Sequence, residues 1–363
     1  MLTLDTEAIS HPRRSTASIM RQVMIALIPG IVLYTLTIDS RLPLNLLLAS
    51  AAALCFEAAL VKLRRRAILP VLKDSSVVLA AILLVLSVPQ SLPHWQLIFA
   101  VFILCTLGKH VFGGLGHNPF NPAMVAYAVL IVSFPLTMTQ WSTENGLLDS
   151  NTAETLQTNH VQNEQLSWDG ITGATPLDRI RNLQRSASHV SDDANVDDQT
   201  NPDSEPGIEI TNAQPAELLI SSDWLWLSIT WLIGGLYLLY LRIISWRIPV
   251  TLLATMWCLY AMYAALASTP VLPASLALFS GAIMLGAFFI ATDPVSAATS
   301  NPGKLVYAIG IGVLCFVIRE FSAYPEGMAF AVLLMNMCVP LIDHAFTRNR
   351  IHIPIASNNR NDR

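Results

Sequence analysis

The sequence predicts an all-α polytopic membrane protein, with about ten transmembrane helices in two five-helix inverted repeats. Apolar residues make up 53% of the 363 and charged residues only 13%, whereas a soluble domain carries about 25% charge. Ten stretches approach the roughly 20 apolar residues that a span needs. The segment that begins at Pro122 also resembles the one that begins at Pro325. Because five helices separate them, the second half would enter the membrane from the opposite side.

The elements follow from these apolar stretches, taken in order. The first is interpreted as a retained helix rather than a signal peptide, because no small-residue cleavage site follows it. The fourth and ninth are short, so we expect them to be tilted or broken. The ten predicted spans are 20–38, 43–61, 76–92, 95–108, 123–141, 223–241, 248–267, 274–291, 305–319 and 328–346.

These spans divide the chain into a first membrane half (1–142), a loop (143–222), a second membrane half (223–347) and a tail (348–363). With a cytoplasmic N-terminus, 16 of the 21 Lys and Arg fall on the cytoplasmic side. The excess of basic residues on that side predicts cytoplasmic termini and an external loop. All five cysteines lie in apolar runs without a CxxC pair, so neither a metal site nor a disulfide framework is expected.

The loop has two parts of different character. Its second part, Ser186 to Glu217, is acidic and free of aromatic residues, so it is expected to be a disordered insertion. Its first part contains Asp169-Gly-Ile-Thr172-Gly173-Ala174-Thr175-Pro-Leu. Small residues leave this backbone open to close approach, and the following Pro stiffens it. With its two hydroxyls, the turn is expected to be an attachment or docking site.

Two polar breaks interrupt the apolar segments. The break over residues 108–122 has four Gly and two Asn-Pro steps, Asn118-Pro and Asn121-Pro. Irregular backbone at membrane depth is tolerated only where protein or a water-filled cavity satisfies its amides. A ligand-lining role is therefore favoured over a simple turn, and His110 and His117 alone do not make a metal site. The second break runs from Ala291 to Lys304.

Several acids within or beside the spans are candidates for ion handling. Asp293 beside Pro294 is either a helix cap or a group on an ion path. Asp74 before the third span has the same two interpretations, with the cap favoured. Glu57 is costly in a membrane unless it is paired. Glu320 is adjacent to Arg319, which suggests local charge compensation.

The turn at residues 169–175 resembles the covalent flavin-attachment sequence of two related membrane proteins: the D subunit of Rnf complexes and the B subunit of sodium-pumping NADH:quinone reductases. Residues 109–123, 291–296 and 324–343 resemble the other signatures of that family, and the similarity runs from about 20 to 346. The Rnf protein is the closer match, since Thr175 is followed by Pro-Leu-Asp and a longer N-terminal extension is missing. The chain departs in having Thr172 where Ser is more frequent, and in its acidic insertion.

The resemblance implies a specific role. Thr175 would carry FMN through a phosphoester bond installed by a flavin transferase outside the cytoplasm, with Asp169 helping that enzyme. A second, non-covalent riboflavin or FMN is placed at the 108–122 break, near Asn118 and Asn121. Electrons would pass between ferredoxin and NAD through partner subunits A, B, C, E and G, moving Na⁺ or H⁺ across a bacterial inner membrane. The side chains themselves would not be catalytic, and no nucleic-acid partner is expected.

Three alternatives remain open. The chain is a B subunit of a sodium-pumping NADH:quinone reductase, a solute channel or transporter of the urea-channel type, or a structural subunit that scaffolds other carriers. Inverted repeats and polar breaks alone do not separate these classes. Attachment at Thr172, or a turn with no ligand, is the alternative for the site itself.

Overall fold

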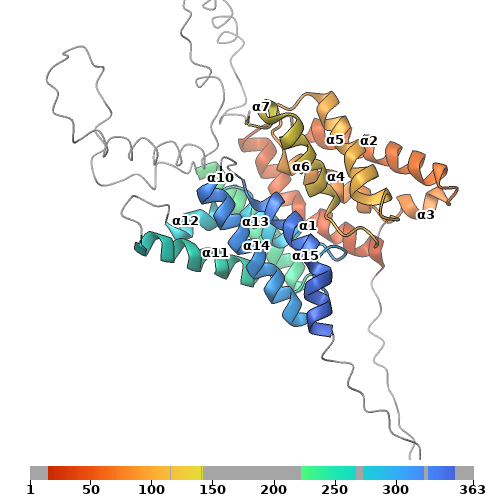
Figure 1. Ribbon diagram of the computed structural model, residues 1–363. Helices are drawn as coiled ribbons and strands as arrows, with labels where there is room; N and C mark the ends of the chain where they lie inside the picture. Colours follow the sequence, from red (N-terminus) through yellow and green to blue (C-terminus); the bar gives the residue numbers. More distant parts are fainter. Residues whose placement is uncertain are drawn as a thin grey trace, which may run out of the picture.

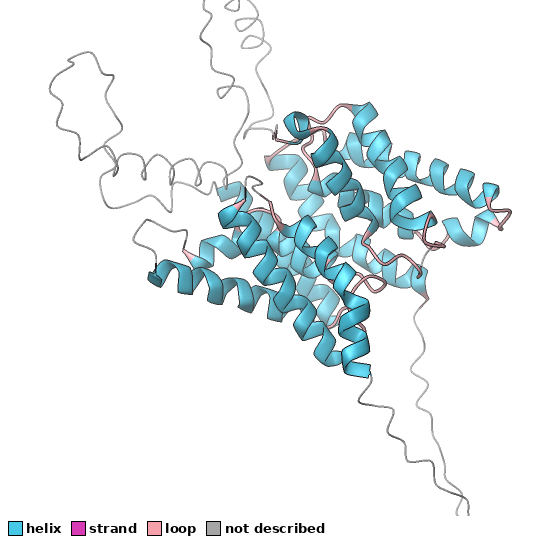
Figure 2. Cartoon of the chain, in the orientation of Figure 1, coloured by secondary structure: helices cyan, strands magenta, loops and turns pink. Residues whose placement is uncertain are grey.

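The computed structural model describes residues 15–114, 116–139, 141, 222–266, 273–322 and 326–347. All regular elements within these ranges are helices (Figure 2). Most of the predicted loop and the predicted tail lie outside the described residues, so those two boundaries stay predictions. The helices form two groups in chain order, drawn in warm and cool colours in Figure 1.

The first half begins at Ser15, whose Oγ accepts a hydrogen bond from the backbone N–H of Ser18 (3.3 Å). Asn121 starts the last long helix of this half in the same way: its Oδ1 accepts from the N–H of Ala123 (3.0 Å), and Pro122 occupies the first helical position. The helices are α1 (Thr16–Thr37), α2 (Leu42–Leu63), α3 (Ile68–Leu72), α4 (Ser76–Ser87), α5 (His94–Cys105), the π-helix η1 (Thr106–His110), α6 (Pro122–Ser133) and α7 (Pro135–Met138).

The second half uses the same devices. Ser300 caps its longest helix by accepting a hydrogen bond from Gly303 N–H on Oγ (3.1 Å), with a Pro in the first turn. The helices are α10 (Ser222–Tyr240), α11 (Arg247–Leu266), α12 (Ala274–Phe279), α13 (Ile283–Leu285), the π-helix η3 (Gly286–Ile290), α14 (Asn301–Phe321) and α15 (Met328–Thr347).

The predicted segments all contain helix, but four differ from expectation. The eighth is broken at Ser280–Ala282, where Gly281 adopts a left-handed φ of 62°. The ninth, expected to be short, is the 21-residue α14, because Ser300 and Pro302 start it early. The third stops at Ser87, and the fifth is interrupted at Phe134, before Pro135. The short helix α3 was not predicted at all.

The two halves meet along α1 against α10 and α6 against α15. Gly30 of α1 permits close approach there, since a Cβ at that position would overlap the Trp231 ring of α10. Within the first half α2 packs on α4 and α5, and within the second α11 packs on α12 and α14. In each half the second long helix thus packs on elements that follow it, and buried apolar side chains from both halves form one core.

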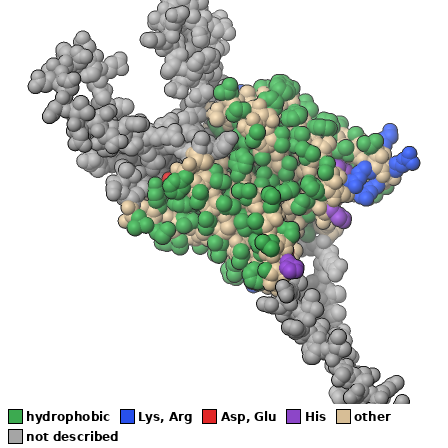
Figure 3. Space-filling view, viewed as in Figure 1, with side chains coloured by type: hydrophobic (Ala, Val, Ile, Leu, Met, Phe, Trp, Pro, Cys, Tyr) green, Lys and Arg blue, Asp and Glu red, His purple; other side chains and the backbone are tan. Residues whose placement is uncertain are grey.

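Among the described residues, four helices are long and apolar enough to cross a bilayer on their own: 16–37, 42–63, 247–266 and 328–346. Apolar side chains cover most of the face seen in Figure 3. Lys and Arg gather at one end of it, over the α2–α3 turn, where Lys62, Arg64, Arg65 and Arg66 are exposed. Over its described residues the chain is thus a helical membrane protein with one markedly basic end.

Candidate functional site

Two cavities lie on the interface between the halves. The first, the polar cavity, brings both predicted polar breaks together around about 500 Å³ of empty space, including the part that is open to solvent. Asn118 and Asn121 come from the first break and Asp293 from the second. Its other polar lining groups are Ser76 and Lys109, and Met20 of α1 closes one wall. The sequence had identified the three predicted residues separately, and the fold makes them neighbours.

The two asparagines serve this cavity differently. Asn121 joins the halves, because its Nδ2 donates to the carbonyl of Ile290 in η3 (3.3 Å) while its Oδ1 caps α6. Asn118 donates from Nδ2 to the carbonyl of Phe120 (3.0 Å). Its buried Oδ1 has no hydrogen-bond partner among the described residues. A buried acceptor of that kind is costly unless something donates to it, so Asn118 offers an open acceptor at this cavity.

The two candidate acids both hold turns. Asp293 Oδ2 accepts from the N–H (3.1 Å) and the Oγ (2.7 Å) of Ser296. It caps a turn rather than a helix, since α14 starts only at Asn301. In this connection between η3 and α14, burial raises the pKa of the Asp293 carboxyl, against the hydrogen bonds from Ser296 that lower it. Asp74 Oδ1 accepts from Ser76 N–H (2.8 Å) and Oγ (2.7 Å). Ser75 rather than Asp74 occupies the N-cap position of α4, so Asp74 holds the turn from one residue before the predicted cap position.

Lys109 links this cavity to a buried charge cluster, the Glu57 cluster, made of Glu57, Lys109 and His110. Lys109 Nζ donates to Glu57 Oε1 (2.7 Å) and to Ser76 Oγ (3.0 Å). His110 Nε2 lies 3.0 Å from Glu57 Oε2. The Glu57 side chain is fully buried, so the expected pairing of this acid is met twice.

The π-helix η1 makes that double pairing possible. Consecutive residues of an α-helix point about 100° apart, so neighbours do not normally reach one group. The wider turn over Thr106–His110 brings both Lys109 and His110 to the two oxygens of one carboxylate. Such π segments occur frequently at functional sites. The polar cavity therefore has a fixed ammonium group on one wall.

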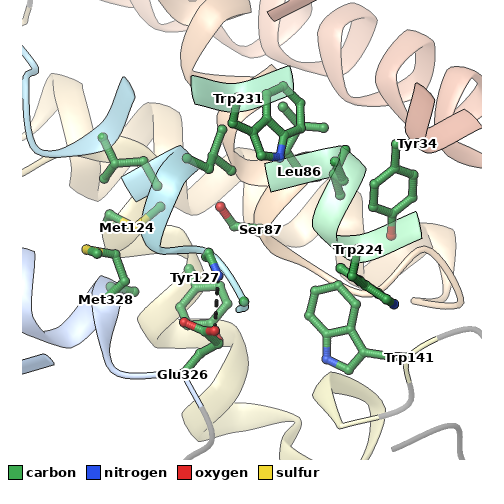
Figure 4. Close-up of a pocket in the computed structure, with 16 residues that line it drawn as sticks. Tyr34, Leu86, Ser87, Met124, Tyr127, Trp141, Trp224, Trp231, Glu326 and Met328 are labelled. Carbon is green, nitrogen blue, oxygen red and sulfur yellow. Dashed lines mark hydrogen bonds between the residues drawn. The ribbon is translucent and has the colours of Figure 1, made fainter. Parts of the chain in front are cut away.

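The second cavity, the aromatic cavity, has about 860 Å³ of empty space between its lining residues, including the part that is open to solvent. Figure 4 shows Tyr34, Tyr127, Trp224 and Trp231 around it, with Trp141 beside Trp224. The Trp141 and Trp224 rings meet edge to face, with centroids 6.4 Å apart. Its remaining lining residues are mostly aliphatic or Met side chains from α4, α6, α13 and α15.

One carboxylate, Glu326, lies on the wall of the aromatic cavity (Figure 4). Its Oε1 accepts from Arg319 Nη2 (2.7 Å) and from the backbone N–H of Ala282 (3.1 Å). The expected compensation between Arg319 and Glu320 is therefore wrong: Arg319 pairs with Glu326. Adjacent residues on a helix do not face each other, whereas the chain reversal after α14 brings Glu326 back.

The predicted attachment turn, with Asp169, Thr172, Gly173, Ala174 and Thr175, lies outside the described residues. Sequence reasoning missed the aromatic cavity, although a signal was present. Trp141 and Trp224 flank the predicted loop closely on its two sides. Glu326 lies within the 324–343 signature but received no role of its own.

The chain matches the model of the NQR2, RnfD, RnfE family over residues 3–352. It is 40% identical over 354 residues to a protein of Aliivibrio salmonicida that is named as the D subunit of an ion-translocating oxidoreductase complex, covering 94% of this chain and 96% of that one. Proteins of the same name from Erwinia tasmaniensis and Vibrio cholerae are 40% identical over 356 residues and 39% over 360, with the same coverage.

Proposed function

Because the chain belongs to the NQR2, RnfD, RnfE family, we propose that it is the flavin-carrying membrane subunit of an Rnf-type, ion-translocating electron transport complex. Its relatives' name already supports a place in a redox complex that moves ions. The proposal adds that Thr175 carries FMN through a phosphoester bond. Asp169, Thr172, Gly173 and Ala174 would form the open turn that the flavin transferase approaches.

The aromatic cavity is the observation that carries this proposal. Small-molecule sites are lined mainly by hydrophobic and aromatic side chains with few polar groups, and five of the side chains here are aromatic: Tyr34, Tyr127, Trp141, Trp224 and Trp231. Aromatic walls suit a planar ring system, which packs against them face to face or edge to face. Residues 142–221, which include Thr175, are joined to the described chain at Trp141 and Ser222, immediately beside this cavity. A flavin attached to that segment would have a binding site for its ring next to the points where the segment joins the described chain.

The residues that line the aromatic cavity would have different roles around a flavin ring. Trp141, Trp224 and Trp231 would hold its faces and exclude water, and Tyr127 would close the wall next to Glu326. The flavin, when bound, supplies the electron transfer itself, while the protein sets position and electrostatics.

The polar cavity would bind a second flavin and lie on the path of the transported ion. Asn118 and Asn121 would bind a second, non-covalent riboflavin or FMN. The polar edge of its ring has acceptors for the Lys109 ammonium and donors for the Asn118 Oδ1. Asp293 remains a candidate for the path of Na⁺ or H⁺. Asp74 does not line the cavity but accepts a hydrogen bond from Ser76, which does.

The proposed topology has ten membrane-crossing segments in two inverted five-helix repeats. Matching contacts of α2 with α4 and α5, and of α11 with α12 and α14, support the repeat. So do the two breaks at left-handed residues, Ser75 before α4 and Gly281 before α13. The basic end at Arg64–Arg66 would face the cytoplasm of a bacterium with both termini, and residues 143–222 would face the periplasm.

The partners follow from the same assignment. Subunits A, B, C, E and G of the complex would exchange electrons with this one, between ferredoxin and NAD. Membrane lipid would cover the apolar surface. Among the alternatives, the shared name of the relatives favours the D subunit of an Rnf complex over the B subunit of a quinone reductase.

The test is in-gel flavin fluorescence of the denatured, full-length protein produced together with the flavin transferase. The wild type and Thr172→Ala should fluoresce, and Thr175→Ala should not. Mass analysis of the Thr175 peptide should show the addition of FMN. Fluorescence that persists in Thr175→Ala, or an unmodified wild-type peptide, contradicts the proposal and returns the solute-transporter alternative to first place.

A further inference from the structure

Glu326 stands out because it is the one carboxylate among the described residues that line the aromatic cavity. The other lining side chains are aromatic, aliphatic or Met, apart from Ser87. A charge beside such a cavity is poorly screened, since apolar walls keep the local dielectric constant low. Whatever binds there experiences this charge strongly.

The surrounding structure fixes that carboxylate from behind. Arg319, whose side chain is 1% exposed, donates to Glu326 Oε1 and also to the carbonyl of Ser280 (3.1 Å). The backbone N–H of Ala282 donates to the same oxygen. A Cβ at Gly281 would overlap the carboxylate, so the left-handed break in the eighth segment leaves just enough room for Glu326.

The pairing with Arg319 does not shield the cavity from the charge of the Glu326 carboxylate. Both hydrogen bonds go to Oε1, and the buried Oε2 has no hydrogen-bond partner among the described residues. Glu326 is a lining residue of the cavity, whereas Arg319 is not. Among the described residues, the full charge that lines the cavity is therefore negative, and the compensating cation lies behind it.

We propose that the negative charge of Glu326 lowers the electron affinity of the flavin ring seated in the aromatic cavity. This inference rests on the proposed function. An added electron makes the ring more negative, and a nearby carboxylate opposes that change. Glu326 would thus make the group harder to reduce and a stronger reductant toward the next carrier.

The experiment uses the full-length subunit, produced with the flavin transferase and purified in detergent. The variants are Glu326→Gln, Glu326→Asp and the control Glu320→Gln, which removes the same charge from the end of α14 without lining the cavity. In-gel fluorescence establishes that the flavin is attached. A spectroelectrochemical titration of the flavin absorbance then gives its midpoint potential.

We expect Glu326→Gln to shift the midpoint potential to a more positive value. Glu326→Asp should remain close to the wild type, because it keeps the charge, and Glu320→Gln should shift it much less. A folded, flavin-bearing Glu326→Gln protein with the wild-type midpoint overturns the inference. If the wild type itself carries no flavin, the proposed function fails instead, so the two failures are distinguishable.

Glu326→Gln leaves the buried Arg319 without its carboxylate, which is destabilising. The double variant Arg319→Met, Glu326→Gln removes both charges together and avoids that problem. It should shift the midpoint in the same direction, by less than a folded single variant would. An unchanged midpoint in the double variant also overturns the inference.

Discussion

The aromatic cavity and the polar cavity occupy one interface, yet they are built for different chemistry. The same helices line both: Leu83 and Leu86 of α4 face the polar and the aromatic cavity respectively, about one helical turn apart. The aromatic cavity has one carboxylate on an apolar wall. The polar cavity has an ammonium group, two amides and a carboxylate. The aromatic cavity suits a planar ring, whereas the polar cavity offers charged and hydrogen-bonding groups to the polar edge of a ligand or to an ion.

The largest expected effect comes from breaking the cluster that supports the polar cavity. Glu57→Gln should lower the free energy of unfolding by about 3–5 kcal/mol, because it leaves the buried Lys109 ammonium unpaired. Unfolding by a denaturing detergent, followed by circular dichroism, measures this. Lys62→Gln, exposed on the same helix, should stay within about 0.5 kcal/mol. Equal losses of unfolding free energy in both variants would show that the Glu57 cluster stabilises the fold no more than an exposed charge does.

Gly281→Ala tests the support of the aromatic cavity. A non-glycine residue at φ 62° costs of order 1–3 kcal/mol, and here its Cβ also meets the Glu326 carboxylate. Gly116→Ala is the matched control, since Gly116 has φ 89° but nothing within 4 Å of an added Cβ. The Gly281 variant should lose more stability than the Gly116 variant. Equal losses in the two variants would mean that Gly281 is required only for its backbone conformation.

Trp224→Leu sharpens the comparison by removing a ring from the aromatic cavity alone. An aromatic pair contributes about 0.5–1.5 kcal/mol beyond the area it buries, so a flavin seated there should become more accessible to iodide quenching. Trp246→Leu, at an exposed position outside both cavities, should leave quenching unchanged. Identical quenching in the wild type and both variants would place the ring elsewhere.

The smallest effect is expected at the polar cavity's open acceptor. Asn118→Ala removes one hydrogen bond to Phe120, worth about 0.5–1.5 kcal/mol, but it also removes the unpartnered Oδ1. Thermal unfolding in detergent should show only a small change. A loss as large as that of Glu57→Gln would mean that Asn118 supports the fold rather than a ligand.

The helical segments were predictable because apolar runs of sufficient length have few other solutions in a membrane. The break at Ser280–Ala282 was missed because a single Gly inside an apolar run is tolerated in a helix. The three residues Asn118, Asn121 and Asp293 were each found from local composition. Their shared cavity was not, because it depends on how the halves pack.

Charge pairing was the least predictable feature. The adjacent pair Arg319–Glu320 suggested itself from the sequence, yet the fold places Glu326 against the guanidinium. Glu57 lies 52 residues before Lys109, and no local pattern joins them. Thr175 was identified from a motif, and its role remains a prediction that only the flavin experiments test.

Because η1 is a π-helix, the number of residues in this turn is itself constrained. Returning this turn to ordinary α geometry would require one residue fewer between Cys105 and Val111. The shortened turn would then aim only one of Lys109 and His110 at Glu57. Conservative replacements at Leu107 should therefore be tolerated, whereas deletion of that single residue should not, because the count of residues in this turn holds the carboxylate's two partners.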